Sequence, residues 1–205
     1  MASLLARIRR RLRFGRPIIV VSGLPRSGTS MAMRMLEAGG LPMVTDGVRT
    51  ADDSNPHGYY EHERVLDLDK NGDTTWLAEA RGRAVKVVSA LLPYLPERYA
   101  YKVIFMRRDL REVVASQHTM LAKRGRPDAP READGDLAAD YEAHLAKIRN
   151  LLARRDSFEV LDVDYREVVR APFDQARRIA AFLGGGLDVD RMAAAVDPAL
   201  HRNRW

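Results

Sequence analysis

The hydrophobic pattern of the chain begins with four β-branched residues, Ile18 to Val21, followed by a turn at Gly23. A continuous apolar run of this length is typical of a strand buried on both faces, as in a parallel sheet. A segment of good helix formers around Met31 to Leu36 comes next and ends at Gly39. The pattern therefore predicts a strand, a glycine-rich loop and a helix in succession.

The same alternation of strand and helix continues along the chain. It predicts an α/β fold of three layers, in which helices cover both faces of a mainly parallel sheet. Ligands of such folds bind at the carboxyl ends of the strands, here residues 22–30 and 106–109. The further predicted elements are a brief strand around Lys86, a strand from Tyr101 to Met106, a helix from Leu110, a long helix from about Leu137 to Arg155, a strand from Phe158 to Val163, and helices near residues 61–70 and 174–183.

Length and composition favour a single soluble domain. The 205 residues, 46% hydrophobic and 30% charged, suffice for one core and contain no apolar run that would span a bilayer. The absence of cysteine excludes disulfides, zinc–thiolate sites and thiol nucleophiles, and it fits a reducing, cytoplasmic location. We expect a basic segment over residues 1–16 and one domain over residues 17–205.

The net charge of +6 favours anionic ligands. Six arginines in the first sixteen residues alternate with apolar residues, a pattern that favours a solvated basic helix or tail, with peripheral membrane contact as the alternative. Elsewhere the arginines are scattered among acidic residues, which argues against a nucleic-acid surface.

The segment from Gly23 to Ser30 carries the strongest chemical pattern. It follows a predicted buried strand and opens a helix, the context in which backbone N–H groups bind phosphate or sulfate. The spacing matches G-x-x-x-x-G-K-[ST], except that Thr29 stands where nucleotide triphosphatases have lysine. The loop therefore suits a donor whose reactive group is attached to a single 5'-phosphate.

Pro25-Arg26-Ser27-Gly28-Thr29-Ser30 resembles the 5'-phosphosulfate loop of the sulfotransferase family, especially its bacterial and tyrosylprotein branches. In that family an arginine at a strand end and a serine eight residues later bind the 3'-phosphate of 3'-phosphoadenosine 5'-phosphosulfate (PAPS). Arg108 and Ser116 have this spacing. The resemblance implies a fold like that of the P-loop nucleotide triphosphatases. It extends through residues 55–61, 162–165 and 182–184, where Tyr165 takes the place of an aromatic residue near the adenine or the 3'-phosphate.

The resemblance implies an in-line transfer of the sulfuryl group that needs no metal and releases adenosine 3',5'-bisphosphate. Arg26 then stabilises the charge on the leaving phosphate. Ser27, Gly28 and Thr29 hold the 5'-phosphate through backbone N–H groups, joined by the hydroxyls of Thr29 and Ser30. The acceptor is a hydroxyl or amine of a small molecule, glycan, lipid or peptide.

The general base is where the chain departs from many relatives, which use a histidine in a Lys-Thr-His-Leu-Pro stretch. The comparable segment from Lys86 to Leu91 has none. Glu61 is the first candidate, because the tyrosylprotein branch uses a glutamate and because residues 41–60 form a long polar loop suited to cover substrate. His57 and His62 are substitutes. Lys86 either adds charge near the sulfuryl group or flanks a strand.

Two other functions stay open on the sequence. A nucleotide phosphotransferase would use the same loop. This chain, however, lacks the loop lysine and an acidic residue that closes an apolar strand to hold Mg²⁺. Asp109 and Asp162 are the nearest approximations. A protein of this fold that binds PAPS without turning it over is the second alternative.

Overall fold

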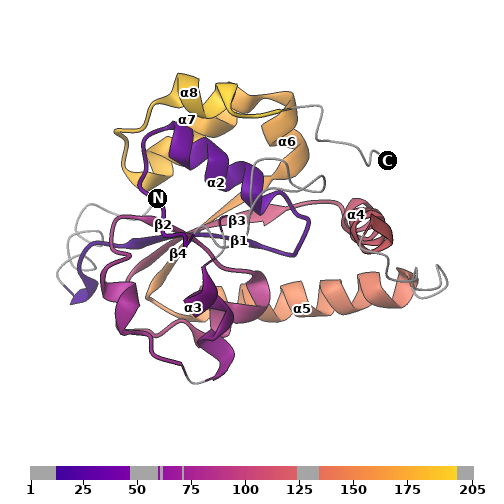
Figure 1. The fold of residues 1–205 in the computed structure, drawn as a ribbon, viewed down its shortest axis with the longest axis horizontal. Helices are drawn as coiled ribbons and strands as arrows, with labels where there is room; N and C mark the ends of the chain where they lie inside the picture. Colours follow the sequence, from indigo (N-terminus) through magenta and orange to yellow (C-terminus); the bar gives the residue numbers. More distant parts are fainter. Residues whose placement is uncertain (1–12, 47–59, 61, 71, 124–133, 198–205) are drawn as a thin grey trace.

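The protein has a four-stranded parallel sheet with the strand order β2-β1-β3-β4 (Figure 1). The structure, a computed structural model, describes residues 13–46, 60, 62–70, 72–123 and 134–197. The strands are β1 (Ile18–Gly23), β2 (Ala84–Lys86), β3 (Tyr101–Arg107) and β4 (Phe158–Asp164). All four coincide with predicted strands, and the α/β fold class is confirmed.

Helices cover both faces of the sheet, as Figure 1 shows. One face carries α2 (Thr29–Ala38), α6 (Tyr165–Arg170), α7 (Pro172–Leu183) and α8 (Val189–Ala194). The other carries α3 (Glu63–Leu66), α5 (Asp134–Arg154) and the 3₁₀ turns η1 (Leu68–Lys70), η2 (Thr75–Ala78) and η3 (Ser89–Tyr94), while α4 (Leu110–Lys123) follows β3.

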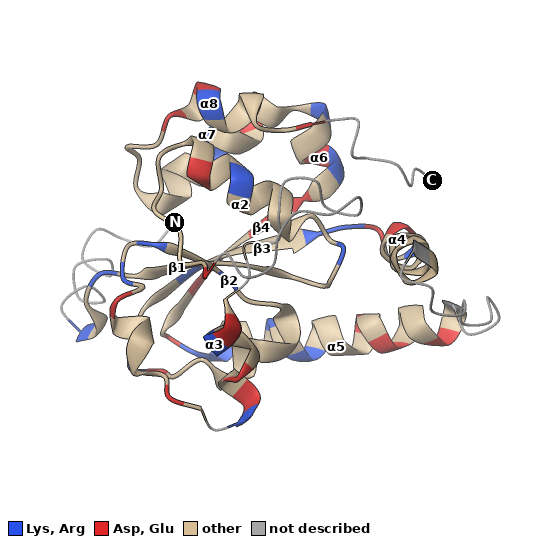
Figure 2. Ribbon diagram, in the orientation of Figure 1, with Lys and Arg blue, Asp and Glu red and all other residues tan. Residues whose placement is uncertain are grey.

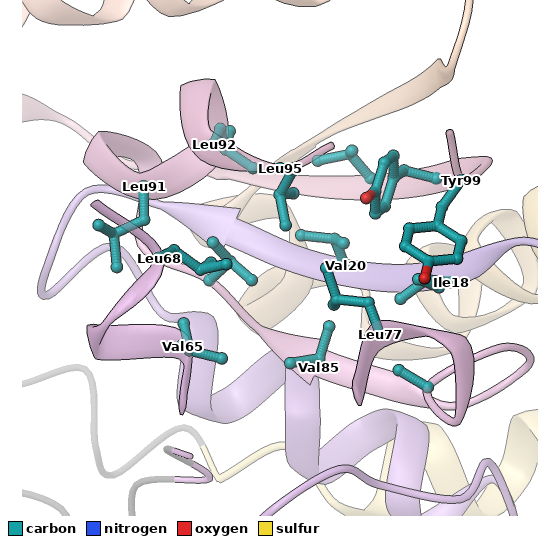
Figure 3. Packing of buried hydrophobic residues seen from close by; sticks show 14 of the residues in the cluster. Ile18, Val20, Val65, Leu68, Leu77, Val85, Leu91, Leu92, Leu95 and Tyr99 are labelled. Carbon is teal, nitrogen blue, oxygen red and sulfur yellow. The ribbon is translucent and has the colours of Figure 1, made fainter. Parts of the chain in front are cut away.

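The alternation of side chains along the central strand divides the core in two. Ile18 and Val20 of β1 point to the face of the sheet that α5 and η3 cover, and they pack in the cluster that Figure 3 shows around Val20 and Leu92. Ile19 and Val21 point to the opposite face, where α2, α7 and α8 contribute their apolar residues. Because both faces are buried, β1 needs the uninterrupted apolar run seen in the sequence.

The order of the strands determines where a ligand is expected to bind. β1 lies between β2 and β3, so the chain leaves the carboxyl ends of β1 and β3 toward opposite sides of the sheet. Gly23 pairs with Met106 at these ends. The loop before α2 and the turn before α4 therefore start side by side, although more than eighty residues separate them.

Several elements differ from the sequence-based expectation. The helix predicted near residues 61–70 is the single turn α3 followed by η1, and α5 begins three residues before the predicted Leu137. The six-residue helices α6 and α8 and the turns η2 and η3 were not predicted. Both short helices have an aspartate N-cap that accepts backbone hydrogen bonds, Asp164 and Asp188. This capping pattern was the available signal.

The charges are distributed over the helices with both signs interspersed, as Figure 2 shows. Within the described residues, no helix is long and apolar enough to cross a membrane. The division into a basic segment and one domain stays a prediction.

Candidate functional site

The loop from Gly23 to Gly28 carries the chain from the end of β1 to the start of α2. The Ser27 N–H donates to the Leu24 carbonyl at 3.1 Å, which closes the turn. Gly28, with φ of 100°, is the N-cap of the ten-residue helix α2 and provides no side-chain cap. The first backbone N–H groups of α2 have no partner within the helix, so this end of α2 suits an anion.

Two glycines are required by close approach as well as by backbone conformation. A Cβ atom on Gly28 would lie 2.5 Å from Cδ2 of Tyr165, and one on Gly23 would lie 2.6 Å from the Met106 carbonyl oxygen. The loop is therefore packed directly against β3 and against Tyr165, the aromatic residue that the sequence associates with the donor.

The hydroxyl groups of the loop are buried beneath its surface. Ser27 is 1% exposed and Thr29 is 6% exposed. The Ser27 Oγ atom is buried and has no hydrogen-bond partner in the structure. A buried hydroxyl without a partner costs free energy, and a ligand oxygen in the loop would supply one.

Arg26 joins the two sequence motifs. Its Nε donates to Oγ of Ser116 at 3.0 Å, across ninety positions of sequence. Ser116 is buried in α4. The backbone of Arg26 has φ of 69°, in the left-handed region that side chains rarely adopt. The loop arginine and the helix serine thus lie in direct contact, while their binding roles stay predictions.

Arg108 is held rigidly by three contacts. Its guanidinium carbon lies 4.2 Å from the ring centroid of Tyr165. Its Nη1 donates to the Arg26 carbonyl at 3.1 Å, and its Nε donates to Glu112 Oε2 at 2.7 Å. Arg108 therefore connects the phosphate loop, α4 and the start of α6.

Glu112 is the site residue that the sequence reasoning missed. Its side chain is fully buried, and its other carboxylate oxygen accepts from Arg166 Nε at 2.9 Å. A buried carboxylate requires such paired donors. The signal was the spacing of Arg108 and Glu112, four residues apart at the start of a helix. The Arg166 contact, 54 residues away, had no local signal.

Lys86 ends β2 beside the loop. It is 8% exposed, and its Nζ lies 3.4 Å from Oγ of Ser30 in the first turn of α2. The Lys86 side chain reaches across from β2 to α2, and a role for its charge near the sulfuryl group stays a prediction.

A cavity of about 430 Å³ opens beside Ser27 and Arg108. It is bounded by the loop, by the turn after β3 and by α5, and its polar lining residues include Ser27, Arg107, Arg108, Glu142 and Arg149. The volume is in the range of small-molecule sites.

Of the three candidate general bases, the structure describes only His62. Glu61 and His57 lie outside the described residues. His62 caps α3, accepting from the Arg64 N–H at 3.2 Å, and stacks on Trp76 with ring centroids 5.2 Å apart. These contacts give His62 a structural role.

The family model described as "Sulfotransferase family" matches residues 72–189, more than half of the chain. No curated protein matches.

Two solved structures share the fold at low sequence identity. The sulfotransferase domain of the Synechococcus PCC 7002 olefin synthase has 19% identity and a TM-score of 0.52, over 90% of this chain and 85% of that one. The sulfotransferase STF1 from Mycobacterium tuberculosis H37Rv has 16% identity and a TM-score of 0.56, over 94% of this chain and 75% of that one. The family match spans β2 to α7, and the two solved structures share the α/β fold. The chain belongs to the sulfotransferase family.

Proposed function

We propose that the protein transfers the sulfuryl group of PAPS to a hydroxyl or amine acceptor. The observation that carries this proposal is the 3.0 Å contact between Arg26 and Ser116, because it joins the loop predicted to bind the 5'-phosphate to the motif predicted to bind the 3'-phosphate. A donor that carries both phosphates is the ligand that uses both motifs.

The chain fits such a donor in two respects. The buried Ser27 hydroxyl lacks a partner that a 5'-phosphate oxygen would provide, beside the N-terminus of α2. The Tyr165 ring and the Arg108 guanidinium form a stacked pair next to the loop, suited to the base or the 3'-phosphate.

PAPS supplies an activated sulfuryl group on a 5'-phosphate, and the protein's task is positioning and charge stabilisation. Arg26 places a permanent positive charge beside the loop, where negative charge grows on the leaving phosphate. Lys86 adds a second cation through its approach to Ser30. Arg108 and Ser116 favour a donor with a 3'-phosphate over ATP.

A nucleotide phosphotransferase is the weaker alternative. Thr29 occupies the lysine position of the triphosphatase loop, and a threonine is short and carries no positive charge to place on a γ-phosphate. Within the described residues, no three His, Asp or Glu side chains gather in a group that would hold a metal ion. Metal independence stays a prediction.

Calorimetric titration with adenosine 3',5'-bisphosphate, the product of the donor, tests the proposal. We expect micromolar binding that weakens at least tenfold when 5'-AMP is used, because 5'-AMP lacks the 3'-phosphate. Tighter binding of ATP with Mg²⁺ would contradict the proposal and favour a phosphotransferase. Donor binding without turnover on any acceptor would indicate an inactive binding protein.

The acceptor class stays broad: a small molecule, glycan, lipid or peptide. A cytoplasmic location, with or without peripheral membrane contact through residues 1–16, stays a prediction as well.

A further inference from the structure

A histidine from the long helix α5 meets the start of η3. Nε2 of His144 lies 2.9 Å from Oγ of Ser89, although 55 residues separate the two. Ser89 is 1% exposed, so its side chain is fixed by the surrounding protein. Neither residue has a role in the site described above.

The contact lies at the edge of the sheet that holds the phosphate loop. Ser89 follows Lys86 by three residues, which places their Cα atoms within about 11 Å even in an extended chain. Lys86 Nζ itself approaches Ser30 of α2. The Val87 N–H donates to the Val21 carbonyl at 3.0 Å, so the chain before Ser89 still runs beside the end of β1.

The α5 side of the contact borders the cavity. Glu142, Leu145 and Arg149 line it together with Ser27 and Arg108. His144 directly precedes Leu145 and turns toward η3. His144 thus stands between two cavity-lining positions in the sequence of α5, Glu142 and Leu145, and its imidazole contacts the segment that follows Lys86.

The surroundings of His144 favour the neutral form of its ring. Burial lowers the pKa of His144 from its ordinary value, and the positive charge of Lys147, three residues along α5, lowers it further. A neutral imidazole at pH 7 has one basic nitrogen. In the tautomer that donates from Nε2 to Ser89, the basic nitrogen is Nδ1.

We propose that His144, oriented by Ser89, is the general base that removes the proton from the acceptor. The inference rests on the proposed function. As the acceptor oxygen or nitrogen bonds to sulfur, the bond from sulfur to the bridging phosphate oxygen breaks and its electron pair stays on adenosine 3',5'-bisphosphate. The acceptor proton passes to Nδ1 of His144, and the imidazolium keeps its Nε2–H bond to Ser89.

This arrangement explains how the chain lacks a histidine between Lys86 and Leu91 and still has an imidazole there. The base comes from a distant helix, and Ser89 of the strand-end segment orients it. A purely structural tie between α5 and η3 would need only the hydrogen bond, which an amide can replace. A base needs a group that accepts a proton.

The test compares His144→Gln, which keeps a hydrogen-bonding side chain, with wild type. Turnover is followed as transfer of the labelled sulfuryl group of PAPS to tyramine or to water. Tyramine offers both a phenol and an amine. We expect turnover to fall about 100-fold or more, because general bases contribute about that much. Affinity for adenosine 3',5'-bisphosphate should stay within about threefold, and the acidic limb of the pH–rate profile should disappear.

Three further variants sharpen the result. Ser89→Ala should lower turnover about tenfold, since the ring then loses its orienting partner. His144→Ala should be rescued by added imidazole. Tyr94→Phe alters a half-exposed residue of η3, the element that Ser89 begins, and is the control that should leave turnover within twofold.

Turnover of His144→Gln within threefold of wild type would overturn the inference. Equal losses of turnover and nucleotide affinity would also overturn it, because they indicate a structural role. If wild type binds the nucleotide but shows no turnover with these acceptors, the test is an NMR titration of the His144 imidazole. Metavanadate added with adenosine 3',5'-bisphosphate should raise the pKa of His144. An unchanged titration would overturn the inference. If wild type binds no nucleotide, the proposed donor itself is wrong.

Discussion

Arg26 combines a strained backbone with a defined side-chain contact. A φ of 69° costs a non-glycine residue free energy that glycine would avoid, on the order of 1–3 kcal/mol. The chain nevertheless has arginine there, with Nε bonded to Ser116 and the carbonyl bonded to Arg108. Such strain in the loop that leads into α2 favours a functional reason for the side chain.

Replacing Arg26 should affect turnover more than donor binding. We expect Arg26→Ala to reduce turnover about 1000-fold, because it removes the charge that stabilises the leaving phosphate, and to weaken donor affinity by no more than about tenfold. Arg108→Ala should mainly weaken binding of adenosine 3',5'-bisphosphate. Steady-state kinetics and calorimetry separate the two effects.

Arg177→Ala is the control for this pair, since Arg177 is exposed on α7, where it pairs with Asp174 one helix turn away and lies over the Phe173 ring. It should change neither quantity. Equal losses of folding stability in Arg26→Ala and Arg108→Ala, without separate kinetic effects, would contradict the assigned roles.

At the scale of elements, one carboxylate ties three segments together. Glu112 in the first turn of α4 bonds Arg108 at the end of β3 and Arg166 in α6. Because Arg108 also contacts Tyr165 and the loop, the position of the donor motifs depends on this ion pair. The same elements that build the sheet edge therefore also fix the guanidinium groups there.

Glu112→Gln should be strongly destabilising. It keeps the volume but leaves the buried Arg108 guanidinium without its counter-charge, so we expect the free energy of unfolding to fall by about 3–5 kcal/mol. Urea denaturation with an unchanged m-value checks this. Glu97→Gln breaks the exposed end of the Glu97–Arg155 pair and should cost less than about 1 kcal/mol. Similar midpoints for the two variants would refute the role of Glu112.

At the scale of the whole molecule, the buried aromatic layer sets an alkaline limit to stability. Tyr101 is fully buried at the start of β3, stacks on Phe158 and donates a hydrogen bond from its hydroxyl to the Pro96 carbonyl at 2.9 Å. Burial raises the pKa of Tyr101 above its ordinary value of 10.0, and the pKa values of Tyr60 and Tyr165 are raised as well, burial being the largest cause for each.

These shifts predict loss of stability at high pH. Below pH 10, near the pKa of tyrosine in the unfolded chain, the stabilisation of the folded state is intact. As the pH rises above 10 this stabilisation is lost, because the tyrosine ionises in the unfolded chain before it ionises in the folded protein. Tyr101→Phe should reduce the slope of stability against pH above 10 by up to about 1.4 kcal/mol per pH unit. At pH 7 it should cost about 1 kcal/mol through the lost hydrogen bond.

Thermal unfolding at pH 7 to 11 measures this slope, with Tyr94→Phe as the control, because Tyr94 is about half exposed. An unaltered slope in Tyr101→Phe would mean that the tyrosine ionises in the folded state.

The local sequence pattern was enough to predict the strands, the loop between β1 and α2, and the spacing of Arg108 and Ser116. These features depend on neighbours within about ten positions: a β-branched run buries both faces of a strand, and glycines permit the loop conformation. The boundaries of α3 and the existence of α6 and α8 escaped prediction, since helices of four to six residues carry too few periods of the hydrophobic pattern.

Residues that are distant in the sequence come together in the site through tertiary packing alone. Arg26 with Ser116, Glu112 with Arg166, and Ser89 with His144 meet across 54 to 90 positions. The parallel order of the strands brings their carboxyl ends to one edge, and the packing of α5 against η3 delivers the imidazole. Local pattern encodes which residues form an element, whereas the partners of a buried charge or a histidine follow from how those elements pack.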